Sequence, residues 1–243
     1  MLNAYLTATR ELLQNPPAPE SLYKTADLTN FINTARGQTA GDGECIRVQA
    51  TYLLPAGTRS FAFPNAAVQA INPKVAGIFN IRQMGWTLGN GMIWLRPRPY
   101  SWFFFYRLNN PAPAPGEITE WSQYGQGADG TIYVDPVPAI DTTLLMDTAC
   151  YPIPLVDDAT PEAIPYPWTD CVPFFAAYYA LLSAQSAARQ DDANRMFQRY
   201  QEFQNRARKM SNADVLPFIY ENSGNPVRNN QLGLSNGGGG GGP

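Results

Sequence analysis

Histidine is absent from this 243-residue chain, which removes the side chain most often used as general base and metal ligand. Without an imidazole, neither a Ser-His-Asp nor a Cys-His arrangement can form. The sequence also lacks the GxxxxGK[ST] pattern that cradles nucleotide phosphates. We therefore expect a protein that is not an enzyme and that holds no cofactor and no metal.

Adjacent carboxylates are the remaining groups that could do chemistry. Asp157-Asp158 and Asp191-Asp192 could each hold a cation, but such pairs in turns and at helix starts are usually caps or solvated groups. Asp129-Gly130 is typical of a turn. The three cysteines, Cys45, Cys150 and Cys171, are widely spaced and form no CxxC, which predicts reduced thiols, mostly buried.

Charge is sparse. Only 15% of the residues are charged, against roughly 25% in ordinary soluble domains, while 12% are aromatic. This balance indicates a surface that other copies or a partner cover in use; a Pro- and Gly-rich β protein with few charges is the alternative. The net charge of −3 argues against a protein that grips phosphates over its whole surface.

The elements that would position these groups are organised around residues 165–210. The Ala-rich run Val172–Ala188 predicts a central helix packed on several faces, too short and too polar for a membrane span. A second helix follows Asp191 or Asp192. One stripe of it is apolar: Met196, Tyr200, Phe203, Ala207 and Met210. The opposite face carries Arg195, Arg199, Glu202, Arg206, Arg208 and Lys209. A short turn makes the two helices an antiparallel hairpin.

The rest of the chain divides by its periodicity. Residues 1–44 predict two helices, the second beginning after Thr25 and ending at Gly41 and Gly43. Residues 45–158 predict short antiparallel strands, with 46–53 and 59–63 forming a hairpin, in a sandwich or a barrel. Residues 159–212 hold the helical hairpin, and 213–243 form an extended Gly-rich arm. The predicted fold is α+β: a helical bundle with an inserted β domain.

An aromatic run, Tyr100–Tyr106, stands between the strands. Its simplest interpretation is a strand buried on both faces or wrapped by a loop. The alternative is a docking surface, because aromatic side chains dominate protein interfaces.

The order of elements carries a resemblance. A capped helix containing Leu28–Arg36, a strand opening at Glu44-Cys45-Ile46-Arg47 and an inserted β region precede a closing helical pair. Three further segments support it: Gly130–Pro138, Tyr151–Asp158 and the helix entry Ile164–Ala180. Over residues 1–212 the chain resembles the head-to-tail adaptor proteins of tailed bacteriophages, most closely the tail tubular protein A group of short-tailed phages.

The resemblance implies a virion protein, assembled in the host cytoplasm and placed in the neck. A ring of about twelve copies would lie under the portal, extend the DNA channel without sequence-specific binding and offer the tail nozzle or tube a platform. We expect the portal to bind Phe218, Ile219, Tyr220, Val227, Arg228, Leu232 and Leu234. We expect subunit or lumen contacts at Arg195, Arg199, Glu202, Arg206 and Lys209, and tail docking at Tyr100, Trp102 and Trp121. No membrane is involved.

Two alternatives remain open from the sequence. One is another neck or tail subunit, such as a stopper, gatekeeper or nozzle-associated protein. The other is a carbohydrate-binding or depolymerising module that uses aromatic platforms and a pair of carboxylates. Its platforms would be Trp94, Tyr100, Trp102 and Trp121, and its acids would come from Glu117, Glu120, Asp129 and Asp135.

Overall fold

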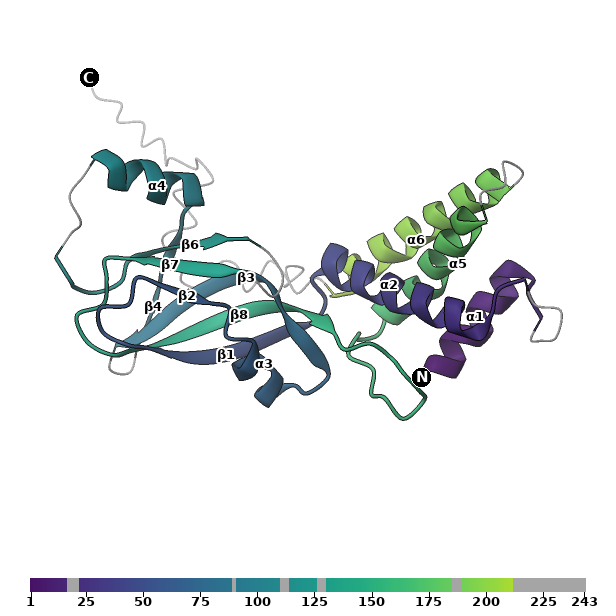
Figure 1. Cartoon of the computed structure of the whole chain (residues 1–243), viewed down its shortest axis with the longest axis horizontal. Helices are drawn as coiled ribbons and strands as arrows, with labels where there is room; N and C mark the ends of the chain where they lie inside the picture. Colours follow the sequence, from purple (N-terminus) through teal and green to yellow (C-terminus); the bar gives the residue numbers. More distant parts are fainter. Residues whose placement is uncertain (17–21, 89–90, 110–113, 126–129, 185–188, 212–243) are drawn as a thin grey trace, which may run out of the picture.

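The chain folds into a helical end and a β-sheet end (Figure 1). The computed structural model describes residues 1–16, 22–88, 91–109, 114–125, 130–184 and 189–211. The predicted α+β class is confirmed.

Four long helices make the helical end. They are α1 (Leu2–Leu13), α2 (Thr25–Gly43), α5 (Val172–Ser183) and α6 (Gln190–Ser211). A 3₁₀ turn, η2 (Trp168–Cys171), leads into α5. Helix α5 packs against α1, α2 and α6, and its Val172, Ala176 and Ala180 are fully buried. The small side chains allow several helices to approach α5 closely, as its Ala-rich sequence predicts.

Helix α6 is amphipathic, as expected. Tyr200 and Ala207 are buried, and Phe203 is half-buried and stacks on Phe174 of α5 with ring centroids 4.8 Å apart. The Tyr200 hydroxyl donates to Asp42 of α2 at 2.8 Å, which ties α6 to a second helix. Met210, predicted on the apolar stripe, is 55% exposed, so the buried stripe ends one turn earlier.

Glycine is required near the end of α2. A Cβ on Gly43 would lie 2.4 Å from the ring of Trp168, whose side chain is buried in the core. The next residue, Glu44, closes the helix in the left-handed conformation, with φ of 44°.

We expect Gly43→Ala to lower the free energy of unfolding by about 1–3 kcal/mol, since the buried indole must shift. Gly37→Ala in the same helix is the matched control, because its Cβ meets nothing within 4 Å. That control should raise stability by about 0.5–1 kcal/mol, because alanine favours a helix more than glycine does. Urea unfolding of both variants measures the difference, and equal midpoints would contradict the predicted clash.

Two four-stranded sheets make the other end. The first has the order β1 (Arg47–Leu54), β8 (Thr142–Pro152), β3 (Val75–Leu88) and β4 (Gly91–Trp94), all antiparallel. The second has the order β2 (Ser60–Ala62), β7 (Thr131–Asp135), β6 (Glu120–Tyr124) and β5 (Arg96–Pro97). Within it only β5 and β6 are parallel. In the described chain neither sheet closes into a barrel.

Buried side chains join the two sheets. Tyr52 of β1 stacks on Phe61 of β2 at 4.6 Å, and the Trp86 indole of β3 donates to the Ile118 carbonyl at 3.1 Å. Met84, Ile132 and Leu144 have no exposed surface. Buried and exposed residues alternate along most of β1, so one face of that strand lies toward the core. The central strand β8 is instead buried at every position from Met146 to Cys150.

Two predictions of local structure were wrong, and one helix was missed. Residues 46–53 and 59–63 do not form a hairpin, because β1 pairs with β8 and β2 pairs with β7 in the other sheet. The aromatic run forms a helix, α4 (Tyr100–Asn109), rather than a strand. A short helix, α3 (Asn65–Ile71), was not predicted. A short apolar run fits a buried strand and a helix equally well, so periodicity alone does not separate them.

Candidate interaction surfaces

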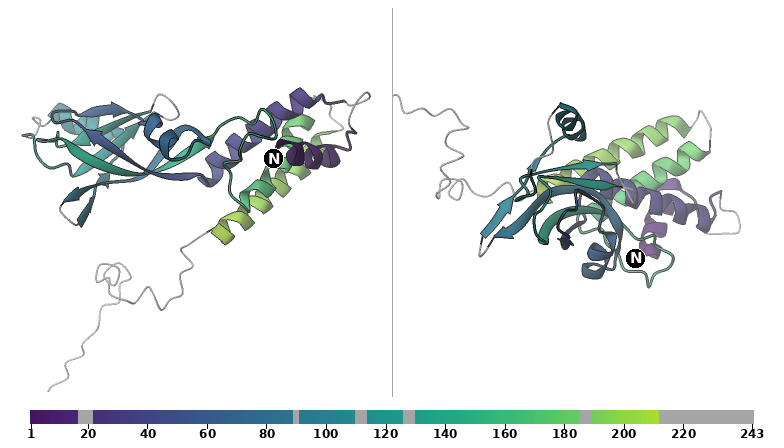
Figure 2. Two further views of the ribbon diagram at one scale, coloured as in Figure 1. Left: turned by 90° about the horizontal axis from the view of Figure 1, so that it is seen from below. Right: turned by 60° about the vertical axis from the view of Figure 1, so that its left-hand side comes forward.

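Helix α4 stands above β6 on the side away from the helical end (Figures 1 and 2). Its first turn is attached to the sheet: the Tyr100 ring lies 4.4 Å from that of Tyr124 and 5.1 Å from that of Tyr133. Phe103 is 4% exposed and anchors the helix. Phe104 and Phe105 are 53% and 61% exposed, so α4 presents two large apolar side chains to solvent.

The other two aromatic residues predicted for tail docking, Trp102 and Trp121, differ in how much of their surface is exposed. Trp102 is half-buried beneath Arg98, whose guanidinium lies 4.9 Å from the ring centroid. Arg98 also donates to Glu120 at 2.7 Å. Trp121, on the inner face of β6, is only 4% exposed. Its role is in the core, and it offers a partner little surface. The exposed phenylalanines belong to the run Tyr100–Tyr106, for which a docking surface was the alternative interpretation, but they were not among the residues predicted for tail docking.

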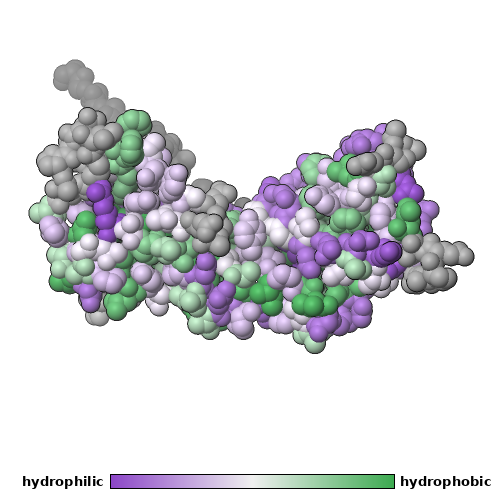
Figure 3. Space-filling view, in the orientation of Figure 1, coloured by the Kyte–Doolittle hydropathy of each residue, from purple (hydrophilic) through white to green (hydrophobic). Residues whose placement is uncertain are grey.

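The predicted charged face of α6 lies in solvent. Arg195, Arg199, Glu202, Arg206 and Lys209 are all exposed. Arg199 donates to Glu202 at 2.9 Å, and Arg195 lies 3.6 Å from Asp192. Such exposed pairs contribute little to stability, so breaking them at a contact surface would cost the fold little. Hydrophilic residues also gather over much of the helical end in the space-filling view (Figure 3).

A buried ion pair holds the loop between β8 and η2 against α2. Arg36 has no exposed surface, and its Nε and Nη2 donate to both oxygens of Glu162, at 3.1 and 2.7 Å. Its Nη1 donates to the Ile153 carbonyl at 2.7 Å. Asn33, one turn earlier, accepts from the Leu155 N–H at 2.8 Å and donates to the Leu155 carbonyl at 3.0 Å.

Two segments that carry the sequence resemblance therefore meet here, the α2 segment 28–36 and the loop segment 151–158. Sequence reasoning missed the roles of Asn33, Arg36 and Glu162. The available signal was an arginine among the apolar positions of α2.

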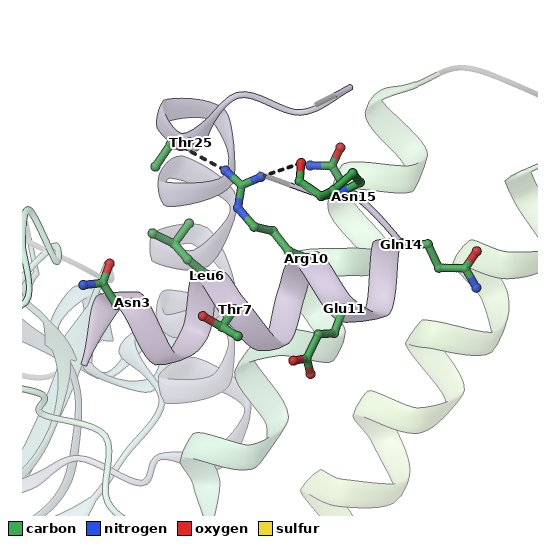
Figure 4. A pocket seen from close by; sticks show the side chains of 9 residues that line it. Asn3, Leu6, Thr7, Arg10, Glu11, Gln14, Asn15 and Thr25 are labelled. Carbon is green, nitrogen blue, oxygen red and sulfur yellow. Dashed lines mark hydrogen bonds between the residues drawn. The ribbon is translucent and has the colours of Figure 1, made fainter. Parts of the chain in front are cut away.

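Next to this loop, α1 borders a groove with a volume of about 650 Å³ (Figure 4). Leu6 and Thr7 lie along it, and Arg10 crosses one side, donating to the Thr25 hydroxyl at 2.9 Å and the Pro16 carbonyl at 3.4 Å. These contacts hold the guanidinium across the side of the groove.

The carboxylates have structural partners. Asp157 accepts from the backbone and hydroxyl of Thr160, and these bonds keep its pKa below the usual value. Asp158 accepts from the Met1 amino group at 2.7 Å and from Asn3, which also lowers its pKa. In the described ranges no three His, Cys, Asp or Glu residues gather closely enough to hold a metal ion.

Two glycine patterns match known functional motifs, one for dinucleotide binding and one for a nucleophilic serine, but neither has the surroundings that its function requires. GxGxxG occurs at residues 125–130, between antiparallel β6 and β7, whereas a dinucleotide site needs a strand-to-helix turn. GxSxG occurs at residues 233–237, outside the described residues, and the chain supplies no histidine base for its serine. Of the predicted sugar-cleaving acids, Glu120 is paired with Arg98, and Asp129 lies outside the described residues.

The predicted portal-binding residues, Phe218 to Leu234, also lie outside the described residues. None of the helices in the described ranges combines the length and apolar character that crossing a bilayer demands.

All three cysteines are unpaired thiols, as predicted. Burial raises the pKa of Cys45 and of Cys171 to about 12 and also raises that of Cys150. Because a raised pKa favours the neutral thiol, at pH 8 only about one in 10⁴ of the Cys45 and Cys171 groups is thiolate, the nucleophilic form.

We expect the folded protein at pH 8 to react with iodoacetamide at least 100-fold more slowly than the urea-unfolded chain, whose thiols have ordinary pKa values. Mass spectrometry of modified Cys45 and Cys171 measures both rates. Equal rates in the two states would contradict the predicted protection.

The comparisons with known proteins agree with the resemblance at the level of the family. A family model described as SU10 adaptor protein matches residues 4–228. No curated protein matches the chain.

Proposed function

This chain belongs to the SU10 adaptor protein family, and on that premise we propose that it forms a ring that joins a phage capsid to its tail. Membership supports a structural head-to-tail adaptor in the neck of the virion. The proposed ring holds about twelve copies, lies under the portal and extends the DNA channel. Kinship with the tail tubular protein A group in particular is part of this proposal.

The observation that carries the proposal is the family match from residue 4 to residue 228 of the 243-residue chain. Two physical features support it. The net charge of −3 suits a channel through which DNA slides, because few phosphates would be held. Large exposed apolar side chains at several places, such as Phe105, Val156 and Tyr166, suit a subunit that neighbours cover.

We assign three contacts to the ring. The segment from Phe218 to Leu234 docks on the portal by burying its apolar side chains there. The cationic face of α6, from Arg195 to Lys209, lies at a subunit or lumen surface. The tail nozzle or tube docks on α4, where we place Phe104 and Phe105 beside the predicted Tyr100 and Trp102 and leave out the buried Trp121.

The decisive experiment mixes the purified full chain with the purified portal and measures the mass of the product. We expect a stoichiometric complex with one ring of this chain per portal. The chain alone serves as the reference and is expected to be smaller than the ring. A chain that forms no complex with the portal would overturn the proposal, and particles that package DNA and acquire tails without this chain would do so as well.

A chain shortened to residues 1–212 tests the portal contact separately. We expect it to unfold at the same urea concentration as the full chain, since the core residues are retained, but to bind the portal at least tenfold more weakly. Sedimentation of the portal mixture measures the affinity. An unchanged affinity would exclude the segment beyond residue 212 as the portal-binding arm.

A further inference from the structure

Strand β1 is an edge strand without the usual protection against pairing. Its eight residues pair with β8 in one unbroken register from Arg47↔Ala149 to Leu54↔Thr142, whereas β3 pairs with β8 through three shifts. Proteins usually guard an edge with lysine, proline, a bulge or a very short strand. β1 contains no proline, and its single charged residue, Arg47, is paired with Asp147.

The hydrogen-bonding groups on the outer side of β1 can be identified from one bond. Cys150 donates its N–H to the Ile46 carbonyl at 2.9 Å, so Ile46 and Cys150 are a hydrogen-bonded pair. Such pairs alternate along an antiparallel ladder. The backbone N–H and C=O groups of even-numbered residues in β1 therefore bond to β8, and those of odd-numbered residues point away from β8, toward the open edge. The backbone groups of Thr51 and Leu53 therefore point toward the open edge, as do those of Arg47 and Gln49.

These outward groups have no partner within the part of the chain that the structure describes. Helix α3 packs beside β1, and in Figure 1 it lies toward the end of the strand nearer α2. The half with Thr51 and Leu53 is farther from α3, and the Leu53 side chain is 59% exposed. An extended segment of another chain could add to this edge through backbone hydrogen bonds.

The opposite edge of the same sheet is formed by β4. Leu95 donates to the Met84 carbonyl at 2.9 Å, which continues the β3–β4 register and leaves the backbone groups of Met92 and Trp94 pointing outward. The Trp94 side chain is 49% exposed. One row of paired residues, Thr51, Leu145, Gly85 and Trp94, crosses the sheet, so Thr51 and Trp94 lie on the same face.

The two edges are complementary because the sheet has four antiparallel strands. With an even number of strands, β1 and β4 run in opposite directions, so β4 of one copy would lie antiparallel beside β1 of the next. Pairing β1 with β1 of another copy would be a two-fold contact that stops at two copies. Pairing β1 with β4 uses two different surfaces and can continue around a ring.

We propose that β1 of each subunit pairs with β4 of its neighbour, so that the four-stranded sheet continues from one subunit to the next. This inference rests on the proposed ring and specifies the contact that closes it. The exposed Leu53 and Trp94 lie on one face of the joined sheet, where cross-strand apolar contact adds to the backbone bonds.

Cysteine pairs test the contact in assembled particles. Phage lacking the chain is supplied with the full chain carrying Leu53→Cys and Trp94→Cys, with Thr51→Cys and Trp94→Cys as a second register. Mild oxidation is expected to give a ladder of covalent multimers on a denaturing gel, and Leu53→Cys or Trp94→Cys alone should give none. Dimers from Leu53→Cys alone would overturn the proposal in favour of two-fold pairing. No ladder from either pair, with the chain present in particles, would also overturn it.

Proline at position 51 gives an independent test. Thr51→Pro removes an outward N–H and no bond to β8, so the subunit should still fold, with its unfolding temperature within a few degrees of the original. We expect at least tenfold fewer copies of the chain per particle, and a normal number for the control Thr51→Val, which keeps the N–H. Normal incorporation of the Thr51→Pro chain would exclude the β1–β4 contact but leave the proposed adaptor function standing. Absence of the unaltered chain from particles would refute the proposed function itself.

Discussion

Glu162→Ala is expected to lower the free energy of unfolding by about 3–5 kcal/mol, the range measured when one partner of a buried ion pair is removed. The reason is that Arg36, with no exposed surface, would keep its charge but lose the carboxylate that accepts from Nε and Nη2. The same carboxylate accepts from the backbone N–H groups of Ala163 and Ile164, at 2.8 and 2.9 Å, and these would also lose their partner. Urea unfolding measures the loss.

An exposed ion pair supplies the matched control. The Arg199 and Glu202 side chains, paired on the surface of α6, are 63% and 62% exposed, so Arg199→Ala should cost no more than about 1 kcal/mol. A double variant, Arg36→Met with Glu162→Leu, should recover much of the lost stability, because it removes both charges and keeps apolar volume. A Glu162→Ala variant as stable as Arg199→Ala would show that the Arg36 charge finds water or another partner.

The buried faces of the helices could be predicted from the sequence, whereas the pairing of the strands could not. Helix α2 begins at Thr25 rather than after it, with Lys24 in place of Thr25 at the cap position, so the predicted cap was wrong. The apolar Leu28 and Ile32 lie one turn apart, and this local spacing determines which face is buried. Strand pairing depends on contacts far apart in sequence. Arg47 and Asp147, which fix part of the β1–β8 register, are separated by 100 residues, so alternation within β1 revealed the strand but not its partner.

A candidate site could be predicted from the sequence where the helical period determines which side chains are exposed. The charged face of α6 follows from the 3.6-residue period, because Arg195, Arg199 and Arg206 recur on the side opposite Tyr200. The Arg36–Glu162 pair joins residues 126 positions apart, so the position of Arg36 among the apolar residues of α2 indicated a buried charge but not its partner. The conformation of the aromatic run was not predictable either, since every residue in it suits a buried strand as well as a helix.

Replacing Phe104 and Phe105 by serine is expected to abolish tail attachment while leaving the fold intact. Both side chains are more than half exposed, so their loss removes little from the core, and stability should stay within about 0.5 kcal/mol of the original. If α4 docks the tail, each buried phenylalanine acts as an anchor whose removal costs about 2 kcal/mol or more of binding. Together the two changes correspond to a roughly 1000-fold loss of affinity.

Particles assembled with the double variant should therefore contain DNA and the ring but lack tails in electron micrographs. Ile140→Ser is the matched control, since Ile140 is 74% exposed and lies outside α4, and we expect normal tails from it. Phe103→Ser separates docking from folding, because Phe103 is buried and its replacement should destabilise the protein measurably. Normal tails on Phe104→Ser/Phe105→Ser particles would exclude α4 as the docking element and would leave the ring proposal standing, because ring and tail contacts use different surfaces.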